Sequence, residues 1–241
     1  MRLLIVGASG LVGRHALELA LADGRIERVI APVRRPIKVE SALDGIPKNA
    51  AMINSSPGDS MPEISGFAAS KLETPIVDYE RLPADAPWWE VDAVICTLGT
   101  TMRQAGSRAA FRRVDLDYVQ MAAECAQRHG AYAFALNSSL GADHRSRASY
   151  YLRIKGETEQ VLRKLGFLSL TIVRPSVIDG QRERRRPLEH ASMRLLRAVG
   201  PLIPRRYRVV PAEAIAQALL EAAITAEPGC HCIESEQLLP A

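Results

Sequence analysis

The sequence LLIVGASGLVG, residues 3–13, decides the fold class of this chain. Its first four residues are all aliphatic, which is typical of a short strand buried on both faces of a parallel sheet. Three glycines follow in the pattern G-x-x-G-x-x-G, and residues 15–22 then have the apolar spacing of a helix. A buried strand that passes through a glycine turn into a helix is typical of a β-α-β unit, so a Rossmann-like α/β fold is expected.

The glycine turn also predicts a ligand. Gly7 permits a tight turn, Gly10 lets the backbone approach a pyrophosphate, and Gly13 lets the helix pack closely on the strand. The helix N-terminus offers backbone N–H groups and a partial positive charge to phosphates. The predicted phosphate-binding residues are Gly7, Ser9, Gly10, Leu11, Val12 and Gly13. The alternative is a strand-to-helix turn of the same shape that binds nothing.

Short apolar runs and helical patterns alternate along the rest of the chain. The expected strands are residues 29–33, 75–78, 91–98, 133–137 and 168–173, and the expected helices are 110–129, 150–165, 188–199 and 212–226. This order predicts a doubly wound parallel sheet with strand order 3-2-1-4-5-6, to which a seventh strand could be added. We expect residues 1–241 to form a single domain, in which residues 176–241 contribute a small lobe on the substrate side.

Composition indicates an ordinary globular protein with a basic surface. Hydrophobic residues make up 47% and charged residues 24% of the 241 residues, and the net charge is +4. Arginine dominates the positive charge, with clusters at Arg112–Arg113, 184–186 and Arg205–Arg206. No aromatic residues are interleaved with these clusters, so a solvated surface is expected and a nucleic-acid partner is not.

Cysteine usage and the chain start bear on metals and location. Of the four cysteines, two form the triplet Cys230-His231-Cys232. No second ligand pair follows at zinc-site spacing, so we expect a short strand there, no metal site and no disulfide framework. The sequence starts with a strand and not a signal peptide, and no window reaches the roughly 18 apolar residues of a membrane span. A cytoplasmic protein is therefore expected.

The end of the second strand favours one nicotinamide cofactor over the other. An NAD site places an acidic residue there against the ribose 2′-hydroxyl. This chain instead has Val33-Arg34-Arg35-Pro36. Arginine suits a 2′-phosphate through charge-assisted hydrogen bonds, so we expect NADP(H) in preference to NAD(H), with Arg34 and Arg35 as contacts. The alternative is that these arginines merely face solvent.

A tyrosine and a lysine stand at helical spacing in the second half of the chain. Tyr151 and Lys155 are four residues apart, so their side chains share one helix face. The neighbouring Tyr150 is paired in this way with Ile154 and does not fit the same role. The expected strand before this helix ends in Asn137-Ser138-Ser139.

Taken in order, these motifs resemble the short-chain dehydrogenase/reductase superfamily in its extended or atypical branch. The similarity is greatest to the Tat-interacting-protein-like oxidoreductases, and it covers residues 1 to about 220. The matching stretches are the glycine turn 7–13, CTLGTT (96–101), VDLDYV (114–119), SSLGAD (138–143), YLRIKGE (151–157) and VRPS (173–176).

The resemblance implies roles for individual residues. Tyr151 would be the general acid/base, and Lys155 would favour the phenolate and bind the nicotinamide ribose. Ser139 would polarise the substrate carbonyl, with Ser138 as the second choice. The residues implied as cofactor neighbours are Asp78 and Tyr79 near the adenine, Leu98, Gly99 and Thr100 after the fourth strand, and Ser138, Lys155, Pro175, Ser176 and Val177 toward the nicotinamide.

The sequence therefore predicts hydride transfer between NADP(H) and a small carbonyl/alcohol substrate. The alternative is a dinucleotide-binding regulator or redox sensor that contacts a protein partner and turns nothing over. Residues 182–186 would attract an acidic substrate, and residues 187–199 would form a lid. Neither the substrate nor the oligomeric state follows from the sequence.

Overall fold

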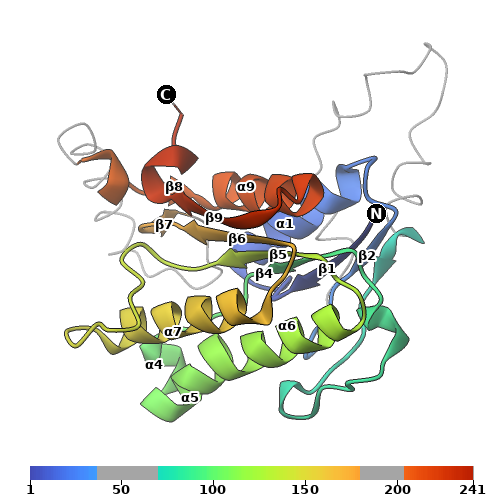
Figure 1. Ribbon diagram of the computed structural model, residues 1–241, viewed down its shortest axis with the longest axis horizontal. Coiled ribbons are helices and arrows are strands. Elements are labelled where there is room, and N and C mark those ends of the chain that lie inside the picture. Colours follow the sequence, from blue (N-terminus) through green and yellow to red (C-terminus); the bar gives the residue numbers. More distant parts are fainter. Residues whose placement is uncertain (37–69, 180–203, 241) are drawn as a thin grey trace.

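A parallel sheet of seven strands forms the centre of the molecule (Figure 1). The computed structural model describes residues 1–36, 70–179 and 204–240. The strands run in the order β3-β2-β1-β4-β5-β6-β9, which confirms the predicted order and adds the seventh strand. Their bounds are β1 (Arg2–Val6), β2 (Arg28–Ile30), β3 (Leu72–Glu73), β4 (Ala93–Cys96), β5 (Ala133–Asn137), β6 (Ser169–Arg174) and β9 (Gly229–Glu234).

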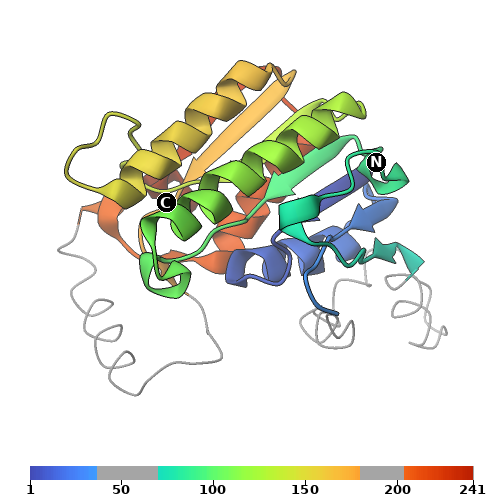
Figure 2. The same cartoon turned by 90° about the horizontal axis from the view of Figure 1, so that it is seen from below.

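Helices cover both faces of this sheet. The helices α1 and α9 lie on one face, and α6 and α7 lie side by side across the other (Figures 1 and 2). A π-helical turn, η3, joins α5 to α6, so the helix predicted at 110–129 is interrupted. The bounds are α1 (Leu11–Ala22), α4 (Met102–Ala105), α5 (Arg108–Arg112), η3 (Arg113–Asp117), α6 (Tyr118–Arg128), α7 (Tyr150–Leu165) and α9 (Ala212–Thr225), with 3-10 turns η1 (Tyr79–Arg81), η2 (Pro87–Trp89), η5 (Arg205–Tyr207) and η6 (Ser235–Leu238).

Two apolar layers form the core, one on each side of the sheet. In β1, Leu3 and Ile5 pack against α1 and α9, whereas Leu4 and Val6 belong to the layer beneath α6 and α7. All four side chains are at most 1% exposed, and full burial of each stabilises the fold by roughly 1.5–3 kcal/mol. This two-sided burial explains why the strand is continuously aliphatic.

The helix α7 begins and ends where its sequence dictates. Ser149 precedes it, and the Ser149 hydroxyl accepts a hydrogen bond from the Leu152 N–H at 3.3 Å. Gly166 follows it with a φ of 75°, a left-handed conformation that glycine adopts without a Cβ penalty. The predicted bounds 150–165 are confirmed, and so are those of β5 at 133–137.

The third strand was predicted in the wrong place. It was expected at residues 75–78, but the pairing with β2 is made by Leu72 and Glu73. Farther along, a single isolated bridge joins Val33 to Ile76. The predicted helix 188–199, the predicted lid 187–199 and residues 182–186, which were expected to attract an acidic substrate, lie outside the described residues.

The chain after residue 203 returns to the end of β6. A short parallel pair, β7 (Ile178–Asp179) with β8 (Val210–Pro211), joins the two segments. Figure 1 shows α4, β7 and β8 gathered at one end of the sheet. Cys230 and Cys232 lie on β9, as the strand prediction for the Cys-His-Cys triplet expected. In the part of the chain that the structure describes, none of the helices is both long and apolar enough to cross a bilayer.

Candidate active and cofactor-binding site

The glycine turn between β1 and α1 has no room for larger residues at two of its glycines. Gly7 has a φ of +90°, and a Cβ there would lie 2.8 Å from the backbone of Thr97 and Leu98. A Cβ on Gly13 would lie 2.1 Å from the Gly7 carbonyl oxygen. Because these contacts are with backbone atoms, Gly7 and Gly13 are required by packing, as predicted from the spacing.

The N-terminus of α1 is left open to an anion. Ser9 and Gly10 are exposed, and Gly10 is the N-cap residue. Among the described residues, no side chain caps this helix, and its first turn carries no acidic residue. The N–H groups of the first turn have no acceptor within the helix. The turn therefore suits the phosphates of a dinucleotide, and Leu11 and Val12 offer their N–H groups there.

The second strand ends at Ile30, earlier than the predicted residue 33, and the segment that follows it carries two exposed arginines, Arg34 and Arg35. The Val33 N–H donates to the Pro75 carbonyl oxygen at 2.9 Å, which holds this segment against the one that leads to Tyr79. Burial raises the pKa of Tyr79, and the charge of Arg34 acts in the opposite direction. Arg34 therefore lies within electrostatic reach of Tyr79.

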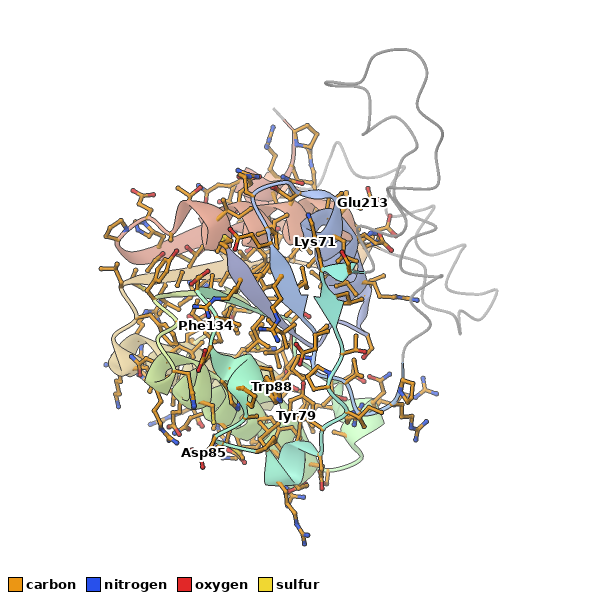
Figure 3. All side chains as sticks on the ribbon, turned by 90° about the vertical axis from the view of Figure 1, so that its right-hand side faces the viewer. Lys71, Tyr79, Asp85, Trp88, Phe134 and Glu213 are labelled. Carbon is orange, nitrogen blue, oxygen red and sulfur yellow. The ribbon has the colours of Figure 1, made fainter. Side chains whose placement is uncertain are left out.

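The two residues predicted near the adenine differ in their surroundings. The Asp78 side chain is exposed and accepts a hydrogen bond from the Glu80 N–H at 2.9 Å. Tyr79 is 5% exposed and belongs with Trp88 to the core layer on the α6 side (Figure 3). Its ring lies tilted against that of Tyr118, with ring centroids 5.5 Å apart. The Tyr79 ring thus supports this edge of the sheet from within the core.

The loop after β4 approaches the catalytic lysine predicted from the sequence. A Cβ on the exposed Gly99 would lie 3.5 Å from Lys155 Nζ and 3.2 Å from Asp115 Oδ1. The Thr100 N–H donates to Asp115 Oδ2 at 2.8 Å. The predicted cofactor-binding loop 98–100 and the predicted catalytic helix therefore meet, with the Asp115 carboxylate between them.

Lys155 lies on the core-facing side of α7 and forms an ion pair. Its side chain is 8% exposed, and Nζ lies 2.8 Å from Asp115 Oδ1. Burial alone would lower the pKa of Lys155, but the charges of Asp115 and Tyr151 outweigh burial and raise it. Lys155 is therefore an ammonium near neutral pH, and it lies within electrostatic reach of Tyr151.

The two adjacent tyrosines of α7 have different partners. Both rings pack on Phe111, with centroid distances of 6.2 Å for Tyr150 and 5.6 Å for Tyr151. The Tyr150 hydroxyl donates to the Arg108 carbonyl oxygen at 3.0 Å, and the guanidinium groups of Arg108 and Arg153 lie over its ring. Among the described residues, the Tyr151 hydroxyl has no hydrogen-bond partner, so it is available to a substrate.

The two serines after β5 are also distinct. Ser138 is buried, and its hydroxyl donates to Glu159 Oε1 at 2.6 Å. Ser139 is half-buried and makes a long contact of 3.5 Å with the Leu140 carbonyl oxygen. The strong bond to a carboxylate occupies the Ser138 hydroxyl, so Ser139 is the serine whose hydroxyl is available.

Two buried acidic residues of the site were not predicted. Asp115 is fully buried on a helical face between Phe111 and Val119, four residues from each, and this apolar spacing was the signal for it. Glu159 is 1% exposed and follows Lys155 by four residues on α7. The residues four positions from Glu159 are Lys155 and Arg163, so its burial has no comparable signal in the sequence.

Glu159 joins α7 to the two last strands of the sheet. Arg174 at the end of β6 donates to both Glu159 oxygens, at 2.6 and 3.0 Å. The same guanidinium donates to Glu234 at the end of β9 at 3.1 Å. Together with the bond from Ser138, this network fixes the serine-bearing end of β5 to the helix that carries Tyr151.

The predicted nicotinamide-side residues follow β6 directly. The Pro175 carbonyl oxygen accepts a hydrogen bond from the Leu140 N–H at 2.8 Å, which joins this segment to the serine loop. The Ser176 hydroxyl donates to the Arg208 carbonyl oxygen, and Val177 is 52% exposed. An exposed apolar Val177 beside the serine loop is available for contact with a ligand.

Comparison with known proteins places these features in a family. No family model matches the chain. The rat protein HTATIP2 (Rattus norvegicus) is 34% identical over 186 residues, which cover 77% of this chain and just under two thirds, 66%, of the rat protein. The protein fmp52, mitochondrial, of Emericella nidulans is 30% identical over 196 residues, which cover 81% of this chain and 75% of the fungal protein.

Solved structures agree with the fold. MoeE5, determined in complex with UDP-glucose and NAD, has a TM-score of 0.67 with 16% identity, over 99% of this chain and 79% of that chain. The expected cytoplasmic location is wrong by these comparisons, because several fungal relatives are named mitochondrial proteins. A strand at the start of a sequence does not determine where a protein resides.

Proposed function

This chain belongs to the family of HTATIP2 and FMP52, proteins similar to short-chain dehydrogenases/reductases, and from this premise we propose that it is an NADP(H)-dependent oxidoreductase. The substrate would be a small molecule with a carbonyl or alcohol group. The observation that carries the proposal is the position of Lys155, buried against the Gly99–Thr100 loop with the available Tyr151 hydroxyl one helical turn before it.

The residues present fit a dinucleotide. Gly7 and Gly13 allow the tight turn that packs α1 on β1, and the uncapped start of α1, with Ser9 and Gly10 exposed before it, offers N–H groups to phosphates. Loop 98–100 and residues 175–177 would border the rest of the cofactor. The preference for NADP(H) rests on Arg34 and Arg35, which are exposed where a 2′-phosphate would lie.

When bound, the nicotinamide ring would supply or accept the hydride. The Ser139 hydroxyl donates a hydrogen bond to the substrate oxygen and polarises the carbonyl. The Tyr151 hydroxyl gives a proton to that oxygen during reduction, or takes one from it during oxidation. The Lys155 ammonium stabilises the phenolate form of Tyr151 while that proton is away, because it is a positive charge within electrostatic reach.

The first test of this proposal is cofactor binding. Calorimetric titration with NADPH and with NADH should show tighter binding of NADPH, and the double variant Arg34→Ala, Arg35→Ala should lose that preference. The matched control is the double variant Arg28→Ala, Arg128→Ala. It also removes two positive charges, one from the first residue of β2 and one from the last residue of α6, and it should bind both nucleotides as the wild type does. If neither nucleotide binds the wild type, the proposal falls.

The second test is turnover. Tyr151→Phe should lower turnover by roughly 10²- to 10⁴-fold, because it removes the proton donor, while NADPH affinity stays within a few-fold of the wild type. Tyr150→Phe is the control, since that hydroxyl bonds to a backbone carbonyl away from the reaction. A wild type that binds NADPH but oxidises none of it across a panel of carbonyl compounds would instead be the dinucleotide-binding regulator.

A further inference from the structure

We propose that Asp115 is a positioning residue of this site, whose buried carboxylate holds the Lys155 ammonium and the Thr100 amide in place at the cofactor-binding edge of the sheet. This inference deepens the proposed function and rests on it for its catalytic meaning. The arrangement itself, a carboxylate that bridges the catalytic helix and the cofactor loop, is testable without a substrate.

Each oxygen of the Asp115 carboxylate faces a different element. Oδ1 lies 2.8 Å from Lys155 Nζ on α7, and Oδ2 accepts from the Thr100 N–H in the loop after β4 at 2.8 Å. The Asp115 side chain is 0% exposed, so water does not screen either contact. One carboxylate thereby fixes the distance between the lysine and the loop, and Gly99 leaves the space in which they meet.

The backbone at Asp115 is held as firmly as its side chain. The Thr158 hydroxyl on α7 donates to the Asp115 carbonyl oxygen at 2.8 Å. Asp115 also lies in the π-helical turn η3, a helix form that is rare and frequently found at functional sites. Two residues on in the same turn, Asp117 is half-exposed and 3.8 Å from Arg112, so it provides a matched comparison.

A buried ammonium needs this partner to stay charged. The titratable groups that act on Lys155 are Asp115 on η3, Tyr151 on its own helix and the Cys96 thiol on β4. Burial raises the pKa of Cys96 to about 12, so the thiol is neutral and offers no charge. With Asp115 removed, burial would favour the neutral amine, and Lys155 would no longer stabilise a phenolate.

The direct test follows the titration of Lys155 by NMR, through the ¹³Cε signal of labelled lysine. The chain has five lysines, and Lys155→Arg assigns the signal. In Asp115→Asn the titration midpoint of Lys155 should fall by at least about one pH unit, because the carboxylate is replaced by a neutral group of the same shape. Asp117→Asn should leave it unchanged. An unchanged midpoint in Asp115→Asn, in a variant that circular dichroism shows to be folded, would overturn the proposal.

A stability cycle keeps the proposal testable if Asp115→Asn folds poorly. Lys155→Met should lower the urea midpoint because it leaves the carboxylate buried without its counter-charge. The double variant Asp115→Asn, Lys155→Met removes both charges and should have a higher midpoint than Lys155→Met alone; an additive loss would contradict the pairing. None of these readouts needs cofactor or substrate, so the bridge can be confirmed even if the proposed oxidoreductase function fails.

Discussion

At the scale of single residues, the adjacent serines after β5 divide two tasks between them. The Ser138 hydroxyl donates a hydrogen bond to the buried Glu159, and this bond joins the end of β5 to α7. The Ser139 hydroxyl makes only a long contact with the Leu140 carbonyl oxygen, so it is available to hydrogen-bond a substrate. The sequence placed both serines at the site but left the choice between them open, because neighbouring serines look the same until their partners are known.

This difference predicts that substitution of one serine affects turnover and substitution of the other affects stability. Ser139→Ala should lower turnover by about 10²-fold or more, as loss of a transition-state hydrogen-bond donor does, and leave the urea midpoint unchanged. Ser138→Ala should lower the free energy of unfolding by roughly 1–3 kcal/mol, because a buried carboxylate loses a donor. Urea unfolding and steady-state kinetics on both variants test this. A turnover loss confined to Ser138→Ala would reverse the assignment.

At the scale of elements, α7 is positioned by a loop that touches it through a glycine. The Asp143 N–H donates to the Leu152 carbonyl oxygen at 3.1 Å, so the loop that follows Ser139 lies directly on the helix. A Cβ on Gly156 would lie 2.1 Å from the His144 backbone N and 2.3 Å from the Asp143 carbonyl carbon. Gly156 therefore lets the serine loop and the tyrosine helix approach each other.

Gly156→Ala should consequently destabilise the protein, by roughly 1–3 kcal/mol or more, although alanine is the better helix former by about 1 kcal/mol. The contact is with backbone, so the loop must move, and turnover should fall with it. Gly24→Ala is the control, because a Cβ at Gly24 meets nothing within 4 Å. Urea unfolding of both variants measures the difference, and a neutral Gly156→Ala would show that the loop moves freely.

Elements with strong local signals form where the sequence predicts them, and elements without such signals do not. The buried β5 and the capped α7 were predicted to the residue, because an apolar run and paired start and stop signals define them. The edge strand β3 was predicted in the wrong place. The Val29 N–H donates to the Lys71 carbonyl oxygen and the Ala31 N–H to the Glu73 carbonyl oxygen. These backbone hydrogen bonds define the strand, and no apolar pattern in the sequence marks it. The π-helical turn around Asp115 was missed because it adds one residue to a helix without a signal in the periodicity.

At the scale of the whole molecule, one of the arginine clusters seen in the sequence, Arg112–Arg113, is paired with carboxylates in the fold. Arg112 pairs with Glu157 at 2.5 Å and Arg113 with Glu80 at 3.1 Å, so this cluster presents little net positive charge. In contrast, Arg34 and Arg35, which follow β2, are exposed. These two arginines are therefore available to an anion at the edge of the sheet where the cofactor is proposed to bind.

Binding at that edge should stabilise the entire chain, since a ligand that binds only the folded state shifts the unfolding equilibrium. NADPH at a hundred times its Kd should add about 2.7 kcal/mol and raise Tm by about 5–10 °C. Ser9→Asp tests whether α1 receives the phosphates. Its new carboxylate should interact favourably with the helix N-terminus and raise the Tm of the free protein slightly, yet it should abolish the NADPH shift by repelling the phosphates.

The control for this opposite pair of effects is Ser107→Asp at the start of α5. The Ser107 hydroxyl accepts from the Ala110 N–H at 3.1 Å, and an aspartate caps a helix equally well, so the NADPH shift should persist there. Thermal unfolding with and without NADPH measures all three proteins. If Ser9→Asp kept the full shift, the phosphates would have to bind elsewhere, and Gly7 and Gly13 would serve only the packing of α1 on β1. If it lost the shift while Ser107→Asp kept it, the start of α1 would be the phosphate site of a molecule whose stability depends on its ligand.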